Sequence, residues 1–191
     1  MAEYRILGTA VLSDGFRQLL RLTLALPDGR TMDREVMDLH AAVALLPFDP
    51  ERRTAILVRQ FRAPVFLKVG EADFIEVPAG MLDKEGDEPE ACARREAMEE
   101  IGLQVADLES VGVMWTCPGV TTELMHLFLA PYTAADRVGA GGGLADEHED
   151  IVVLETPLAE LPRMIASGEL SDMKTVVLVQ ALQLRRPELF Q

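Results

Sequence analysis

Residues 80–103, GMLDKEGDEPEACARREAMEEIGL, decide how the rest of the chain is interpreted. They predict a helix over residues 89–101, because Asp87 is placed to cap it and Pro89 has the backbone angle of a first helical turn. Gly102 follows at a position where helices commonly stop. The segment therefore carries its own start and stop signals, and its side chains can be assigned to faces of a helix.

This helix is amphipathic in an unusual way. At about 100° per residue, Ala97, Met98 and Ile101 share one apolar stripe. Three carboxylates share the opposite side: Glu96, Glu99 and Glu100. Like charges at this spacing destabilise a helix by about 0.2–0.5 kcal/mol per pair. A bound divalent cation would relieve that repulsion, and hard Mg²⁺ prefers such oxygen ligands. Spacing alone favours an ordinary solvated surface, because glutamate-rich helices are common.

Length and composition fit one domain with a small extension: the chain has 191 residues, of which 49% are apolar. Its net charge of −14 disfavours nucleic-acid binding, since phosphate backbones would be repelled. Two cysteines are too few for a disulfide framework. No apolar run reaches the roughly 18 residues of a membrane span, and no secretory signal is recognised. These features predict a cytoplasmic protein with no nucleic-acid or membrane partner.

The remaining sequence reads mostly as strands. Leu20, Leu22 and Leu24 alternate with other residues as in a half-buried strand, and residues 31–39 can return as a second, so we expect a β-rich N-terminal extension at residues 1–40. Further strands are predicted at residues 42–48, 55–60, 74–77, 111–115 (with Trp115 in the core), 124–130 and 151–154, and further helices at 158–167 and 174–184. Because helices do not alternate regularly with strands, we expect an α/β fold class, and within it an α+β sandwich in which a mixed β-sheet lies between helices.

A glycine-rich stretch, residues 139–143, immediately precedes the acidic run of residues 146–150. Glycine freedom beside carboxylates suits a mobile loop that brings acids over a site. The alternative is a surface loop with solvating charge, which is the more common case for a charge run. The local sequence favours that alternative.

Residues 95–103, REAMEEIGL, resemble the second half of the Nudix box at every specified position. In that box Arg-Glu is followed by an apolar residue, any residue, Glu-Glu, any residue, Gly and an apolar residue. The first half departs from the pattern, because six residues separate Gly80 from Asp87 instead of five, and Asp87 stands where the family has glutamate. The departure leaves the role of Asp87 open.

The resemblance to Nudix hydrolases extends over most of the chain. Residues 40–43 and 45–50 resemble the bacterial ADP-ribose pyrophosphatases. Pro118 has a placement typical of the ADP-sugar branch, which GDP-mannose hydrolases can share. Residues 60–62 and 122–126 are closer to the related GDP-mannose hydrolases. Residues 143–151 resemble both, on what is in these relatives the catalytic loop. That likeness favours a functional role for the acidic run.

The resemblance implies a Nudix fold at residues 41–191 and hydrolysis of the pyrophosphate bond of a small-molecule nucleotide sugar. ADP-ribose is slightly favoured, giving AMP and ribose 5-phosphate, with GDP-mannose close behind. The alternative is a non-catalytic Nudix-fold sensor or regulatory module. It also implies a homodimer, in which residues 1–40 pair between subunits and Arg34 is lent across the interface.

Site residues follow from the same resemblance. The implied cofactor is Mg²⁺, with Mn²⁺ as an alternative and the number of ions open, and its implied ligands are Glu96, Glu100, Glu99 and the main-chain carbonyl of Ala79. The implied catalytic residues are Arg95, which would hold Glu96 or its neighbour in register, Glu99, which would position water, and Glu147 and Glu149, whose roles as base and ligand are not divided. The implied substrate contacts are Arg62, Arg34, Pro118 and Glu123.

Overall fold

The computed structural model describes residues 3–83, 86, 88–144 and 150–191. The chain divides into two compact units. The N-terminal unit comprises Met1–Ala41 and Met114–Met125, and the main unit comprises Ala42–Val113 and His126–Gln191. In the described part of the chain, no helix has both the length and the apolar character needed to cross a membrane.

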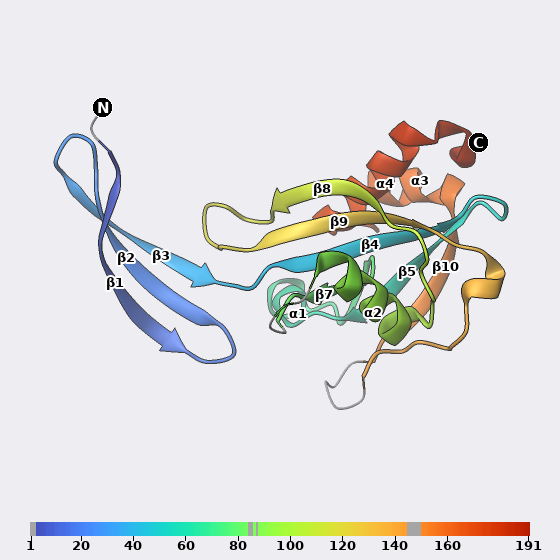
Figure 1. The fold of residues 1–191 in the computed structure, drawn as a ribbon, viewed down its shortest axis with the longest axis horizontal. Helices are drawn as coiled ribbons and strands as arrows, with labels where there is room; N and C mark the ends of the chain where they lie inside the picture. Colours follow the sequence, from blue (N-terminus) through green and yellow to red (C-terminus); the bar gives the residue numbers. More distant parts are fainter. Residues whose placement is uncertain (1–2, 84–85, 87, 145–149) are drawn as a thin grey trace. The chain divides into compact units, whose positions relative to one another are not determined.

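The main unit is built on a seven-stranded sheet (Figure 1). The strands run in the order β10-β5-β4-β9-β8, with β6 beside β5 and β7 beside β4. Their bounds are β4 (Ala42–Asp49), β5 (Thr54–Phe61), β6 (Asp73–Glu76), β7 (Ala79–Met81), β8 (Glu109–Trp115), β9 (Leu124–Pro131) and β10 (Val152–Pro157). The short strands β6 and β7 pair antiparallel with the ends of β5 and β4, next to the sheet centre.

Helices cover this sheet because its central strand is apolar on both faces. Every residue of β4 is buried; Val43 and Leu45 join the core cluster that includes α2, while Ala44 and Leu46 alternate with them and are also fully buried. Helix α4 also contacts β4 (Figure 1). The helices are α1 (Ala63–Val69), α2 (Pro89–Ile101), α3 (Leu161–Ser167) and α4 (Met173–Arg185). The predicted mixed sheet between helices is confirmed.

Several local expectations were wrong or incomplete. Helix α2 has the predicted bounds and its N-cap is Glu88, which makes no side-chain capping hydrogen bond; Asp87, the predicted cap, lies outside the described residues. Met98 is 39% exposed and Trp115 is 55% exposed, so neither belongs to the core as expected. Two elements of the main unit, α1 and β7, were not predicted at all.

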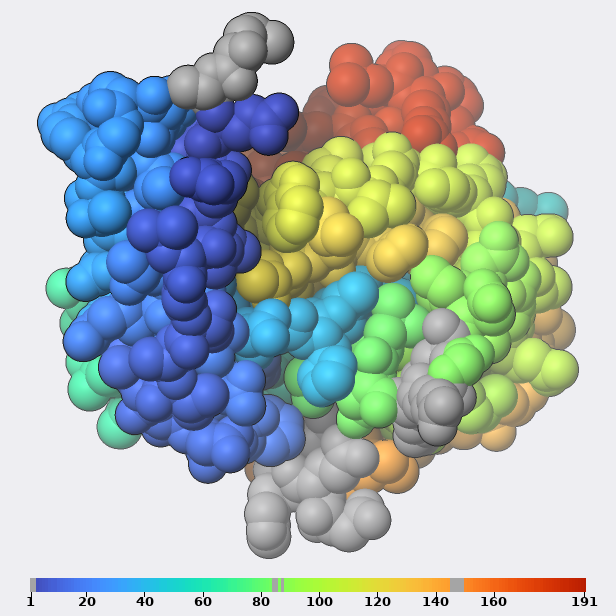
Figure 2. Space-filling view, turned by 60° about the vertical axis from the view of Figure 1, so that its left-hand side comes forward, coloured from blue at the N-terminus to red at the C-terminus, as the bar shows by residue number. Residues whose placement is uncertain are grey.

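The N-terminal unit contains a three-stranded antiparallel sheet in the order β1 (Arg5–Asp14), β2 (Gln18–Ala25), β3 (Thr31–Asp38). The tip of the β8–β9 hairpin is bonded to the end of β3: Leu39 N–H donates to Thr122 Oγ1 at 2.8 Å, and Met37 N–H donates to the Val120 carbonyl at 2.9 Å. All ten residues of β1 are exposed, and Figure 2 shows this strand, in the darkest blue, on the outside of its unit.

The glycine-rich stretch is packed against the end of α2. Gly142 N–H donates to the carbonyl of Glu100 at 2.9 Å, and Gly143 N–H donates to that of Glu99 at 3.2 Å. A Cβ at Gly141, whose φ is +71°, would lie 2.4 Å from the Glu100 carbonyl oxygen. Residues 139–143 therefore do more than provide conformational freedom, because these glycines let the backbone approach and satisfy the open carbonyls of the helix.

Substitution of Gly141 by alanine tests this packing. Positive φ and backbone overlap together should lower the free energy of unfolding by roughly 2–4 kcal/mol. Gly168 is the matched control, because its φ is +82° and its missing Cβ would meet nothing within 4 Å. Gly168→Ala should therefore cost only about 1 kcal/mol. Urea unfolding measures both, and equal losses would show that the close approach at Gly141 contributes nothing.

Candidate active site

The candidate site is formed where one row of α2 side chains lies along β7. Residues four apart on a helix share a face, and Cys92, Glu96 and Glu100 form such a row. Cys92 Sγ donates to the Met81 carbonyl at 3.4 Å, and Ala79 N–H donates to Glu100 Oε2 at 3.2 Å. Helix and strand therefore meet residue by residue, and the row delivers two carboxylates to the strand.

Gly80 allows the middle contact of this row. A Cβ at Gly80 would lie 2.1 Å from Cδ and 2.3 Å from Oε1 of Glu96, far inside contact distance. Only a residue without a side chain leaves room for the Glu96 carboxylate to lie directly on the strand. The adjacent row of the same helix packs in the core, since Ala93, Ala97 and Ile101 are fully buried there.

Arg95 pairs with this row from the side. Its Nη2 lies 3.4 Å from Glu96 Oε1 and donates to Cys92 Sγ at 3.2 Å. The side chains of Arg95 and Glu96 are 24% and 15% exposed, so solvent screens this ion pair only in part. The contact is the one expected of a residue that holds Glu96 in register.

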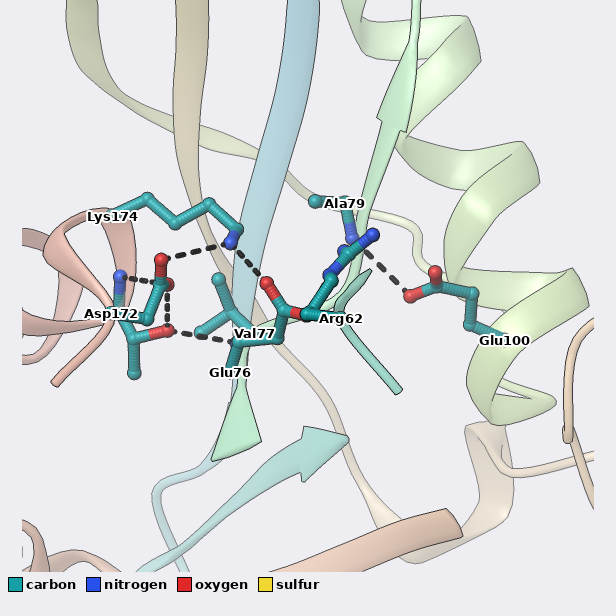
Figure 3. Close-up of polar contacts among 8 residues, drawn as sticks. Arg62, Glu76, Val77, Ala79, Glu100, Asp172 and Lys174 are labelled. Carbon is teal, nitrogen blue, oxygen red and sulfur yellow. Dashed lines mark hydrogen bonds and ion pairs between the residues drawn. The ribbon is translucent and has the colours of Figure 1, made fainter. Parts of the chain in front are cut away.

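Glu100 is the most buried of the three glutamates, with 2% exposure, whereas Glu99 is half-buried. The amide of Ala79 donates to Glu100, as Figure 3 shows. A carboxylate that accepts a backbone hydrogen bond is favoured in its charged form. Glu96 and Glu100 are thus brought together at adjacent residues of β7, while Glu99 lies next to them along the helix.

Arg62, which follows β5, belongs to a buried ion cluster beside Glu100 (Figure 3). Its Nε donates to Glu76 Oε1 at 2.5 Å, and Lys174 Nζ donates to the other oxygen of Glu76. Lys174 also pairs with Asp172 Oδ1 at 3.0 Å. Burial by itself would lower the pKa of Arg62, but the charges of Glu76, Glu100 and Asp172 outweigh it and hold that pKa above its usual value.

This cluster joins α4 to the strand that carries Glu76. Asp172 caps α4 by accepting from Thr175 N–H at 3.0 Å, and Thr175 Oγ1 in turn accepts from Val77 N–H at 2.9 Å. Sequence reasoning missed Glu76, Lys174 and Asp172. The one local signal was a charged residue, Glu76, inside an otherwise apolar strand, since a buried carboxylate requires a partner.

The other predicted site residues lie elsewhere or outside the described part. Arg34 is on β3 of the N-terminal unit, where its Nη1 donates to the Asp33 carbonyl at 2.8 Å. Pro118 is exposed and Glu123 half-buried in the hairpin tip of the same unit. Glu147, Glu149 and Asp87 lie outside the described residues.

The donors at β7 suit a hard divalent cation. Among the residues that the structure describes, no three His, Cys, Asp or Glu side chains form a ready-made metal cage. Mg²⁺ does not need one, because it usually keeps several waters and binds through one or two carboxylates plus substrate phosphates. Glu96 and Glu100 supply two such carboxylates, so the residues present fit the cofactor expected from the sequence.

Comparison with known proteins found a matching family model and similar proteins. A family model described as the NUDIX domain matches residues 38–176. The chain is 40% identical over 179 residues to a GDP-mannose pyrophosphatase of Escherichia coli O1:K1 / APEC, covering 91% of this chain and 92% of that protein. It is also 40% identical over 187 residues to a GDP-mannose pyrophosphatase of Shigella dysenteriae serotype 1 (strain Sd197), covering 95% and 96%.

A solved structure, described as the crystal structure of an ADP compounds hydrolase, has a similar fold. It aligns with a TM-score of 0.79 and 19% sequence identity, over 97% of this chain and 95% of that one. At this level of identity the likeness concerns the fold, and it agrees with the mixed sheet and helices described above.

Gly80→Ala tests the close contact between α2 and β7. The added Cβ must displace the Glu96 carboxylate, so we expect Mn²⁺ to bind about tenfold more weakly or worse. Gly15→Ala is the control, because its missing Cβ would meet nothing within 4 Å and it lies between β1 and β2. Titration followed by electron paramagnetic resonance reports free Mn²⁺ directly. Unchanged affinity in the folded Gly80→Ala variant would remove Glu96 from the metal site.

Proposed function

The chain belongs to the NUDIX family as a pyrophosphohydrolase, and on this premise we propose that it uses Mg²⁺ to hydrolyse the pyrophosphate bond of a nucleoside diphosphate sugar. The observation that carries the proposal is the convergence of Glu96 and Glu100 on two adjacent residues of β7. An intact acidic pair at this position speaks against the alternative of a non-catalytic sensor, which would not need it.

GDP-mannose is the first candidate substrate, giving GMP and mannose 1-phosphate. The support is the 40% identity, over more than nine-tenths of each chain, to proteins named GDP-mannose pyrophosphatase. Sequence patterns alone slightly favoured ADP-ribose, and the placement of Pro118 keeps ADP-ribose as the second candidate.

The proposed mechanism assigns distinct tasks to the residues of the site. When bound, Mg²⁺ neutralises the diphosphate and lowers the pKa of a coordinated water. Glu96 and Glu100 hold the cation, with Glu99 and the carbonyl of Ala79 as further ligands, while Arg95 keeps Glu96 in place. Arg62 binds a phosphate oxygen. Glu147 and Glu149, between which the roles of metal ligand and water-activating base are not divided, lie outside the described residues.

We also propose that the protein is a homodimer paired through the N-terminal unit. The strand β1 exposes large apolar side chains: Ile6, Leu7, Val11 and Leu12, with Phe16 in the turn that follows it. An exposed apolar strand at a sheet edge readily pairs with another chain, and a second copy would cover it. In such a dimer, Arg34, Pro118 and Glu123 would serve as substrate contacts from this unit.

Product analysis tests the proposed reaction. Purified protein with Mg²⁺ should release GMP from GDP-mannose or AMP from ADP-ribose, and EDTA should stop the release, because the diphosphate is then no longer neutralised. Glu100→Gln should lower kcat by roughly a hundredfold or more. Glu90→Gln is the matched control on the same helix, since Glu90 is 61% exposed and pairs with Arg94 in the first turn.

Turnover of neither nucleotide sugar by the wild type would refute the proposed reaction. Near-normal turnover by a correctly folded Glu100→Gln variant would instead place the metal site elsewhere. The first outcome is measured on the wild type and the second on the Glu100→Gln variant, so the two are distinguished.

Light scattering tests the dimer. The wild type at micromolar concentration should have twice the mass of one chain, and Ile6→Glu with Leu12→Glu should shift it to a monomer, because charges would be buried in the interface. Leu184→Glu is the control, since Leu184 is 84% exposed on α4 of the main unit. A monomeric wild type would contradict the proposal.

A further inference from the structure

Glu76 is a buried carboxylate that the reaction does not obviously need. It is 1% exposed at the end of β6, opposite Val58 on β5. Removing such a group from water costs several kcal/mol, and an apolar residue of similar volume is often as stable or more so. Stability alone therefore gives little reason for a carboxylate here, which directs attention to the groups that it holds.

The two carboxylate oxygens of Glu76 bind two cationic side chains, and these two side chains differ in how far they are exposed to solvent. Lys174 is 14% exposed and also pairs with Asp172, so it is fixed on the α4 side. The side chain of Arg62 is 40% exposed, so it is anchored to Glu76 through Nε and still partly accessible to solvent. With Asp172 included, two acids face two bases, so Lys174 holds Glu76 in place whatever Arg62 binds.

The bond through Nε fixes how Arg62 is presented. A guanidinium is planar and carries five N–H groups in a rigid fork, so a hydrogen bond through Nε sets the direction of both Nη groups. In the described part of the chain, the hydrogen bond of Arg62 to another side chain uses Nε. The Nη groups therefore remain for an anion, with their orientation already set.

Arg62 lies on the side of Glu100, one of the proposed metal ligands. Figure 3 shows Arg62 between Glu76 and the Ala79–Glu100 contact. The charge of Glu100 is also one of the causes that raise the pKa of Arg62, as expected of neighbouring groups. A phosphate on a cation held by Glu100 would therefore lie near these Nη groups.

We propose that Glu76, backed by Lys174, is a positioning residue that holds the Arg62 guanidinium with its Nη groups toward the diphosphate. This inference rests on the proposed function. Glu76 itself touches neither the metal nor the substrate and acts only through Arg62. Its loss should therefore weaken substrate binding without removing the metal site.

A double-mutant cycle tests whether Glu76 acts through Arg62. We expect Arg62→Met to raise KM for the hydrolysed nucleotide sugar about tenfold, and Glu76→Gln to approach that value. The double variant should be no worse than Arg62→Met, because each change removes the same interaction. Mn²⁺ affinity should stay at the wild-type value in all three, which distinguishes the effect from damage at Glu96 and Glu100.

Two further variants separate positioning from simple structural support. Glu109→Gln removes one partner of another ion pair, to Arg186 at 2.5 Å, and should leave KM unchanged. Arg62→Lys keeps the positive charge but replaces the planar fork by a point charge, so KM should rise. If urea unfolding shows that Glu76→Gln does not fold, the KM of Arg62→Lys still tests the inference. A wild-type KM in Arg62→Lys, or effects of Glu76→Gln and Arg62→Met that multiply, would overturn the inference.

Failure of the proposed function would be recognised separately. If the wild type hydrolyses no nucleotide sugar, the same variants are compared by calorimetric binding of GDP in the presence of Ca²⁺. Weaker GDP binding by Glu76→Gln and Arg62→Met, again without additivity, would sustain the inference in a non-hydrolytic protein. Unchanged GDP binding, or none by the wild type, would overturn it.

Discussion

The structure depends on the alignment of one helical row with three consecutive residues of a short strand. Cys92, Glu96 and Glu100 meet Met81, Gly80 and Ala79 in order, so α2 and β7 are in register along the whole contact. The adjacent row of the helix is anchored in the core, and β7 is anchored by pairing with β4. Two carboxylates are therefore fixed by packing on both sides, which is the preorganisation that a metal site requires.

Crowded carboxylates need opposing charge, and the fold supplies it from several elements. Arg95 pairs with Glu96 from the same helix, and Arg62 lies beside Glu100 from the end of β5. Arg62 in turn depends on Glu76 and, through Lys174, on the first turn of α4. Among the described residues, the cations beside these acids are thus held by buried groups, and a divalent ion would supply further opposing charge.

The amino-acid sequence alone predicted the features that depend on short-range patterns of residues. The bounds of α2 follow from Pro89 and Gly102, and the row of glutamates follows from helical spacing. The cluster of Glu76 and Lys174 joins positions 98 residues apart, and no local period reports such a contact. Glycine illustrates the same limit: residues 139–143 read as flexible from composition, but only the fold reveals that they pack on the end of α2.

The most direct test of this account is to locate the metal itself. A crystal grown with Mn²⁺ and measured at the manganese absorption edge would give an anomalous difference map of the protein. The account predicts its strongest peak within bonding distance of the Glu96 and Glu100 carboxylates, beside Ala79 and Gly80. A strongest peak at the acids of the Glu76 cluster, or no peak on α2, would contradict the claim that the α2–β7 contact forms the metal site.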